Sequence, residues 1–159
     1  MPLTRVSLES TTVDYLVTWL ARVGLSTVTD GTNPAVNGRI VETMEAFGYA
    51  VADPTNVTDD DLAAVPDSQA RRFRWHVIYY TYLLVEFRFA GSGGNITSFT
   101  AGNTSQTFKD LGADLSRLLK LILAELDRAG GLIARPAGSV SGLIRAGRCR
   151  SSDSRGRLA

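Results

Sequence analysis

Apolar residues recur every three or four positions along most of this chain, which is the spacing of one face of an α-helix. The pattern predicts five helices joined by polar loops. They are expected from Ser10 or Thr11 to Gly24, from Asn33–Pro34 to Asp53–Pro54, over a short stretch after Thr58, from Pro66–Asp67 to about Phe89, and from Thr104 or Ser105 to Ala129–Gly131. We therefore expect an all-α fold, a small helical bundle.

The starts of two helices carry capping signals. Asn33 followed by Pro34 places a good N-cap residue before a proline that suits the first helical turn. Thr58 has an acidic residue, Asp61, three positions later, which resembles a capping box. The three consecutive aspartates that begin at Asp59 could also suggest a cation site. A helix N-terminus accounts for them better, because ligands this close in sequence do not make a calcium loop by themselves.

The two longest helices differ in how their apolar residues are distributed. After Val77, the helix that ends near Phe89 is apolar nearly all the way round, which is typical of a helix at the centre of a bundle or of one covered by a partner. The last helix instead has one leucine-rich stripe, which favours packing on the other helices. Its members are Phe108, Leu111, Leu115, Leu118, Ile122 and Leu126, with Leu119 and Leu123 widening it.

A polar, glycine-rich insert separates these two helices. It runs from Gly91 to about Asn103, and a weak alternation around Ile96 and Phe99 predicts an extended arm or a hairpin. After Gly130 no period is sustained, so residues 131–159 are expected to form a flexible C-terminal tail. The chain thus divides into a helical domain over residues 1–130, with its insert at 91–103, and the tail.

Charge is unevenly shared between these parts. The whole chain has a formal net charge of +1, but residues 135–159 hold six arginines and one aspartate. The tail therefore has an excess of five positive charges, and the rest of the chain an excess of four negative ones. A basic tail of this kind is either a non-specific hook for nucleic acid or a chain end without a specific role.

Motifs for catalysis or for binding a cofactor are missing from the sequence. His76 is the single histidine and has no nucleophile motif beside it, so a structural role within the helix is favoured. Cys149 is the single cysteine, which excludes an internal disulfide and a multi-cysteine metal site. The most apolar run, residues 77–89, is too short to span a bilayer. We expect no enzyme, no cofactor, no metal site and no membrane partner.

The order of the predicted elements carries a resemblance to a known family. The segments concerned are DSQARRFRWHVIYYTYLLVEFRF (67–89), NITSFTAGNTSQTFKDLGADLSRLLKLILAEL (95–126) and the tail. A helical bundle with an extended insert before its last long helix resembles the head–tail connector (adaptor) proteins of tailed phages and of phage-derived gene transfer agents. The likeness covers about the first 130 residues and is one of element order.

This resemblance implies a structural protein of the virion neck, made in the host cytoplasm. Such proteins form a ring, usually of twelve copies, beneath the portal protein and join it to the next neck or tail protein. The terminal segment often reaches the portal or a neighbouring copy, which would make the tail arginines contacts to an acidic surface or to passing DNA. The residues implied as contacts are Ile96 and Phe99 in the insert, and Leu132, Ile133, Leu143, Ile144, Arg145, Arg148 and Arg150 in the tail.

Two other functions stay open on the sequence. Arg71, Arg72 and Arg74 interleave with aromatic residues, and with the basic tail they suit a small nucleic-acid-binding or regulatory helical module. The alternative for these arginines is a solvated helix face. An assembly factor of unrelated ancestry, for a virion or a cell envelope, is the third hypothesis.

Overall fold

The structure, a computed structural model, describes residues 3–91, 98–101, 104–107 and 109–133. It is all-α with a small hairpin, as the sequence predicts. The elements in chain order are α1 (Arg5–Arg22), α2 (Pro34–Ala46), α3 (Asp59–Leu62), α4 (Asp67–Gly91), β1 (Ser98–Ala101), β2 (Thr104–Thr107) and α5 (Lys109–Arg128).

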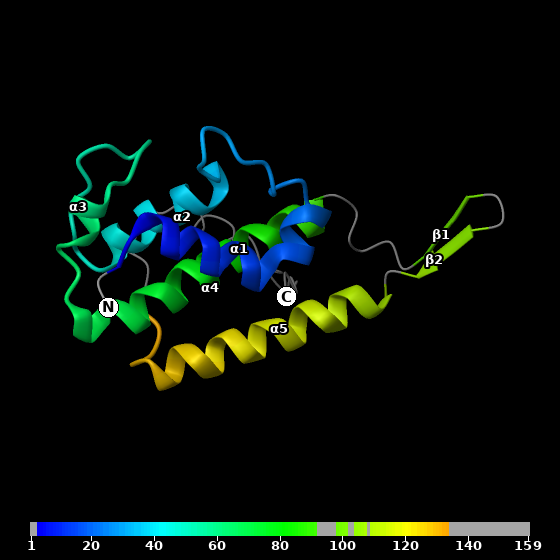
Figure 1. The fold of residues 1–159 in the computed structure, drawn as a ribbon. Helices are drawn as coiled ribbons and strands as arrows, with labels where there is room; N and C mark the ends of the chain where they lie inside the picture. Colours follow the sequence, from blue (N-terminus) through cyan, green and yellow to red (C-terminus); the bar gives the residue numbers. More distant parts are fainter. Residues whose placement is uncertain (1–2, 92–97, 102–103, 108, 134–159) are drawn as a thin grey trace, which may run out of the picture.

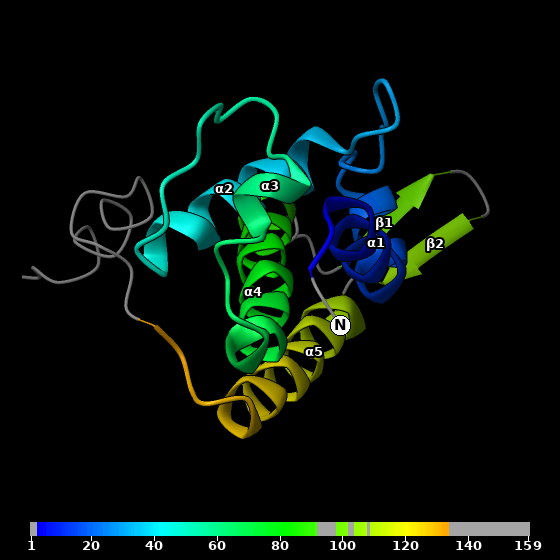
Figure 2. The ribbon, with the colours of Figure 1, turned by 60° about the vertical axis from the view of Figure 1, so that its left-hand side comes forward.

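Helix α4 is the central element of the bundle. Helices α1, α2 and α5 each pack directly on it, and α5 runs back along it in the opposite direction (Figures 1 and 2). This position confirms the prediction made from its all-round apolar surface, because a helix covered on several sides has no single polar face. The hairpin of β1 and β2 lies beyond the ends of α4 and α5 (Figure 1).

The core divides into two groups of buried side chains along α4. The first, here named the α2 cluster, surrounds Phe73 and Val77 and includes Ile40 and Met44 of α2. The second, the α5 cluster, surrounds Ile78, Tyr82 and Val85. Its other buried members are Leu16, Leu20, Leu115, Ile122 and Leu126. Burial of each large apolar side chain contributes about 1.5–3 kcal/mol to folding, so α4 anchors both groups.

The start of α1 differs from the prediction. The helix begins at Arg5, not at Ser10 or Thr11, and the hydroxyl of Thr4 caps it by accepting a hydrogen bond from the Ser7 N–H at 3.3 Å. Leu8 is fully buried in the α2 cluster. The first turns therefore form because they bury an apolar residue. Ser10 and Thr11 suit a helix N-cap, and the prediction therefore placed the start of the helix too late. The predicted end at Gly24 is confirmed, since this residue has φ +72° just after the helix.

The end of α2 was also predicted wrongly. The helix stops at Ala46 rather than near Asp53–Pro54. Gly48 adopts φ +81°, and the Tyr49 N–H turns back to donate to the Met44 carbonyl at 2.9 Å, which closes the helix. Val51 still packs against the α2 cluster from the loop that follows. An apolar residue at helical spacing is thus no proof that the helix continues.

The N-caps predicted at Asn33 and Thr58 are confirmed. The side-chain oxygen of Asn33 accepts hydrogen bonds from Ala35 N–H at 3.0 Å and Val36 N–H at 3.2 Å. Thr58 and Asp61 form the complete capping box of α3. The acidic run is thereby explained by the helix start, as the sequence favours.

The insert contains a two-stranded antiparallel hairpin. Strand β1 pairs with β2 so that Phe99 lies opposite Gln106 and Ala101 opposite Thr104. The last helix was predicted to start at Thr104 or Ser105, but those residues belong to β2, and α5 begins at Lys109. The threonine and serine that suit a helix cap suit a strand equally well. The predicted stop of α5 is confirmed at the glycine pair after Arg128.

Candidate functional site

The hairpin is the first candidate contact region. Figure 1 shows it standing off the end of the helical body. Phe99, one of the two predicted contact residues, lies within β1. Ile96, the other, lies outside the described residues. The antiparallel pair α4 and α5 forms the base from which this hairpin projects.

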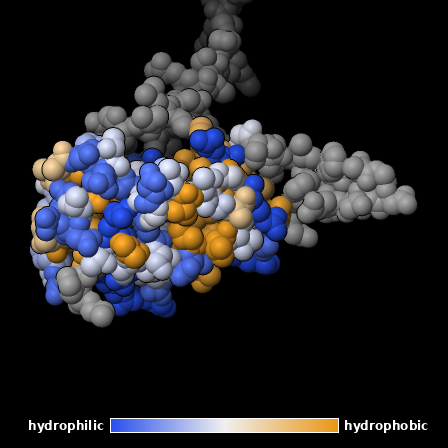
Figure 3. All heavy atoms as spheres, turned by 45° about the horizontal axis from the view of Figure 1, so that its top comes forward, coloured by the Kyte–Doolittle hydropathy of each residue, from blue (hydrophilic) through white to orange (hydrophobic). Residues whose placement is uncertain are grey.

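Exposed hydrophobic side chains occur on the same end of the body as the hairpin. Val17 of α1 is 55% exposed and Phe87, in the last turns of α4, is 57% exposed. Figure 3 shows hydrophobic residues gathered on one part of this face of the body. Solvent exposure of a large aromatic ring such as Phe87 is unfavourable in an isolated protein, and apolar surface of this kind is typical of contact with another chain.

The second candidate region is the segment that follows α5. Leu132, a predicted contact residue, is 49% exposed, and Ile133 beside it is partly buried. Gly130 and Gly131 have φ +116° and +82°, a backbone shape that favours glycine and turns the chain sharply out of α5. The remaining predicted tail contacts, Leu143, Ile144, Arg145, Arg148 and Arg150, lie outside the described residues.

Two α4 side chains fix this segment to the body. The Arg72 Nε–H donates to the Gly131 carbonyl at 2.8 Å, and the Ile133 N–H donates to His76 Nε2 at 2.9 Å. We name these contacts the C-terminal clasp. The guanidinium of Arg72 also lies over the ring of Phe47, 5.9 Å from its centroid. The clasp thus joins the end of α5 to the middle of the bundle.

His76 is fully buried at the centre of the clasp. Its Nδ1 lies 2.8 Å from the Arg72 carbonyl, while Nε2 accepts from Ile133, so both ring nitrogens have partners. Phe47 and Tyr80 meet the ring edge-on, with centroids 5.1 and 5.9 Å away. Desolvation by this burial lowers the pKa of His76. The structural role predicted for this residue is consistent with these contacts.

The arginines at the start of α4 do not form one open basic stripe. Arg71 makes an ion pair with Glu125 of α5 at 3.1 Å, and Arg72 belongs to the clasp. Arg74 is partly buried. Two of the three guanidinium groups therefore contact the body itself, which leaves less basic surface on α4 than the sequence suggests.

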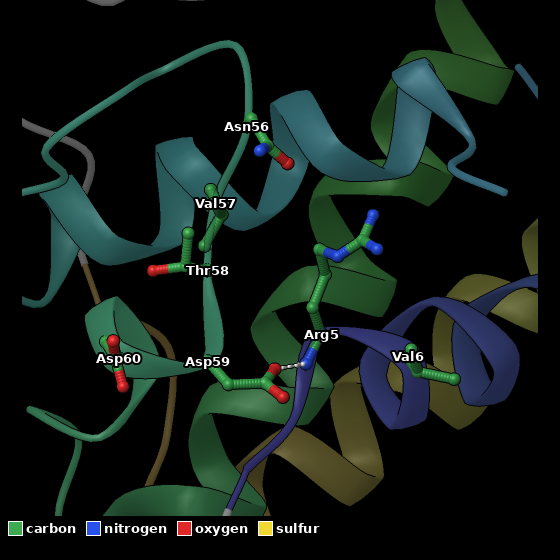
Figure 4. A pocket seen from close by; sticks show the side chains of 7 residues that line it. All are labelled: Arg5, Val6, Asn56, Val57, Thr58, Asp59 and Asp60. Atoms are coloured by element: carbon green, nitrogen blue, oxygen red, sulfur yellow. Dashed lines mark hydrogen bonds between the residues drawn. The ribbon is translucent and has the colours of Figure 1, made fainter. Parts of the chain in front are cut away.

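A shallow hollow of about 310 Å³ lies between the start of α1 and the loop before α3. Figure 4 shows the Asp59 carboxylate accepting a hydrogen bond from the Arg5 N–H, 2.7 Å, while the side chain of Asp60 points elsewhere. The Arg5 guanidinium extends away from Asp59 and donates to the Thr32 hydroxyl. These contacts tie the N-terminal turn of α1 to neighbouring loops and account for the polar groups structurally.

Neither a metal-binding cluster nor a membrane-spanning helix is found among the residues that the structure describes. Among those residues, no three or more histidine, cysteine or acidic side chains come close enough to hold a metal ion. None of the helices described is both long and apolar enough to cross a lipid bilayer.

The structure separates the predicted contact residues into two groups rather than joining them. Phe99 lies just before α5 and Leu132 just after it, so the 20 residues of this helix separate them. At a rise of about 1.5 Å per residue, that is about 30 Å. Sequence reasoning missed the part that Arg72 and His76 play in holding the chain after α5, since their partners are backbone groups more than fifty residues away.

Comparisons of the chain with protein-family models, with curated proteins and with solved structures give no significant match.

Proposed function

We propose that this protein is a structural component of a virion neck, a head–tail connector that forms a ring beneath the portal protein and joins it to the next neck or tail protein. The observation that carries the proposal is the hairpin projecting from a base of two long antiparallel helices, α4 and α5 (Figure 1). A projecting hairpin can be bound by a partner through the backbone groups of a strand edge. The resemblance in element order supplies the identity of the partners.

Two contact regions at opposite ends of α5 suit a protein that bridges two others. In this proposal the hairpin and the apolar surface near Phe87 meet a neighbouring copy or the next neck protein. The chain after Ile133 meets the portal or a neighbouring copy, and its arginines contact an acidic surface or passing DNA. The work of such a protein is assembly, and no step of it requires a cofactor or bond-making chemistry.

The most informative variants alter the hairpin alone. Replacing residues 92–107 by a short glycine–serine linker is expected to abolish binding to the portal–connector–neck assembly while the helices remain. Phe99→Ala should weaken that assembly by about tenfold or more if the ring becomes buried in an interface, since anchoring aromatic residues contribute about 2 kcal/mol or more. Thr100→Ala, one position along the same strand, is the matched control.

Assembly is measured by incubating each variant with purified portal and neck proteins from the same genome and isolating the complexes by sedimentation. Circular dichroism checks that the helical content is unchanged. Full assembly by the linker variant would contradict the proposed role of the hairpin. Failure of the wild-type protein to bind any of these proteins, combined with retention on DNA that falls steeply with salt, would favour the nucleic-acid-binding module instead.

A further inference from the structure

The hydrogen bonds of His76 define its protonation state. The Ile133 N–H can only donate, so the Nε2 atom that it meets at 2.9 Å must be unprotonated. The imidazole proton then lies on Nδ1 and points to the Arg72 carbonyl at 2.8 Å. The clasp therefore selects the neutral ring with its proton on Nδ1.

A second proton on His76 is incompatible with this arrangement. Both nitrogens would then be donors, and Nε2–H would face the Ile133 N–H across the same short distance. The charged ring would also be fully buried beside the positive charge of Arg72. Either effect is relieved if the segment that carries Ile133 moves away.

The surroundings offer little to stabilise a charged ring. On α4 the ionisable groups next to His76 are Arg72, whose charge opposes protonation, and the Tyr80 phenol. Phe47, the residue just after α2, packs against the ring and does not titrate, and the segment after α5 presents the backbone amide of Ile133. Burial is the largest cause that lowers the pKa of His76, and only the hydrogen bond to the Arg72 carbonyl acts the other way.

The segment itself is suited to local opening. Two hydrogen bonds attach it to α4, from Arg72 and to His76, and Leu132 between them is half exposed. Its other printed hydrogen bond, from the Gly131 N–H to the Leu126 carbonyl, stays within the end of α5. Gly130 and Gly131 allow the chain to turn without straining α5. Local opening of a segment with few buried apolar contacts costs only a small fraction of the free energy of global unfolding.

We propose that the clasp is a pH-sensitive switch: it holds Gly131–Ile133 on α4 while His76 is neutral and releases them when His76 is protonated. Because all later residues follow Ile133, the switch sets the direction in which the C-terminal chain leaves the body. The inference rests on Arg72, His76 and the segment after α5, and does not depend on the proposed assembly function.

The sign of the pH dependence follows from the direction of the shift. A pKa lowered by folding means that the clasped state binds protons less readily than the released one. The clasp is therefore intact above the ordinary histidine pKa of 6.5 and weakens progressively as the pH falls below it. Each further pH unit lowers the clasped fraction relative to the released one by about tenfold, until the pKa of the clasped state is reached.

Nuclear magnetic resonance of the full chain tests this directly, because His76 is the single histidine and gives the only imidazole signals. At about pH 7.5 the ring should show the Nδ1–H tautomer, and the Ile133 amide should be protected from hydrogen exchange. Lowering the pH to about 5, which is about 1.5 units below the ordinary histidine pKa of 6.5, should reduce that protection by up to about thirtyfold after correction for the intrinsic rate. If Ile133 stays protected while His76 titrates, or if His76 stays neutral until the whole protein unfolds, the switch is overturned.

Two variants separate the clasp from effects on folding. Ile133→Pro removes the donor without touching any helix, and should raise the pKa of His76 because the neutral ring loses a hydrogen bond. His76→Gln retains an oxygen acceptor that does not titrate, so protection of the Ile133 amide should become independent of pH. Leu132→Ala is the matched control and should titrate like the wild type. A His76 pKa unchanged by Ile133→Pro would contradict the proposed contact.

Discussion

The two halves of α4 lie in different surroundings. Around Phe73 the α2 cluster collects side chains from many short pieces, including Leu3 before α1, Val57 in a loop and Leu62 of α3. Around Tyr82 the α5 cluster is built almost wholly from the long helices α1, α4 and α5. Loops and a short helix cover the first half of α4, whereas long helices alone pack against most of the second half. The hairpin lies beyond the end of that second half (Figure 1).

The exposed apolar residues follow the same division. Beside the α5 cluster, Val17, Phe87, Leu121 and Leu123 are all at least one-third exposed. The N-terminal turn of α1, near the α2 cluster, contributes Val6. The comparison teaches that the α2 cluster is enclosed by short pieces of its own chain, whereas several apolar side chains beside the α5 cluster remain exposed.

The largest expected effect comes from truncating the centre of the enclosed half. Phe73→Ala should lower the free energy of unfolding by about 3–5 kcal/mol, because the ring is fully buried and the cavity left behind collapses only partly. Phe87→Ala, on the same helix but 57% exposed, should change it by less than about 0.5 kcal/mol. Urea denaturation measures both. Equal losses for the two would contradict the division of α4 into enclosed and open halves.

Ile122→Ala tests the α5 cluster. The side chain is fully buried, so a loss of about 2–5 kcal/mol is expected. Hydrogen exchange should show the loss first in the amides of α5, because this helix packs mainly on α4. Leu121→Ala, the adjacent position with a 59% exposed side chain, is the control. Uniform loss of protection across all helices would show that the two halves unfold as one.

Loss of a helix cap should lower the free energy of unfolding less than loss of a core side chain does. Thr58→Ala removes the hydroxyl of the capping box and should cost about 1 kcal/mol. The expected local effect is faster hydrogen exchange in α3, where the Asp61 N–H loses its acceptor. Asn56→Ala, in the same loop, should leave both unfolding and exchange unchanged within about 0.5 kcal/mol. A matching loss in this variant would mean that the loop, rather than the cap, determines stability there.

A comparable small effect is expected where α5 meets α4. The Tyr82 hydroxyl is buried and donates to the Leu115 carbonyl at 3.0 Å. Burial raises its pKa to about 12, so the group stays protonated throughout the neutral range. Tyr82→Phe should therefore cost about 0.5–1.5 kcal/mol at any pH between 6 and 9. A cost that varied with pH in this range would contradict a neutral hydroxyl at this position.

Much of the fold was accessible from the sequence because its signals are local. The cap at Asn33, the capping box of Thr58 and Asp61, and the leucines of α5 each depend on residues within a turn or two. The start of α1 and the end of α2 were missed for a different reason. Leu8 and Tyr49 are placed by packing and by a glycine turn, and an apolar pattern alone does not show where a helix gives way to a loop.

The candidate contact regions were predictable only in part. The position of the hairpin follows from the glycine-rich insert between two long helices, and Phe99 lies in one of its strands. The clasp could not have been predicted, since Arg72 and His76 bind backbone groups of Gly131 and Ile133, and backbone groups leave no mark in the sequence. Bonds of this kind become visible only once the antiparallel packing of α5 on α4 is known.

The most direct test of the connector proposal is the mass of the protein in solution. Light scattering on a sizing column would be recorded for the protein alone, and then after mixing with the portal protein encoded in the same genome. The proposal predicts a monomer or weak oligomer alone, and on mixing a large complex whose mass corresponds to a ring of copies on the portal. Two unshifted peaks after mixing would contradict it.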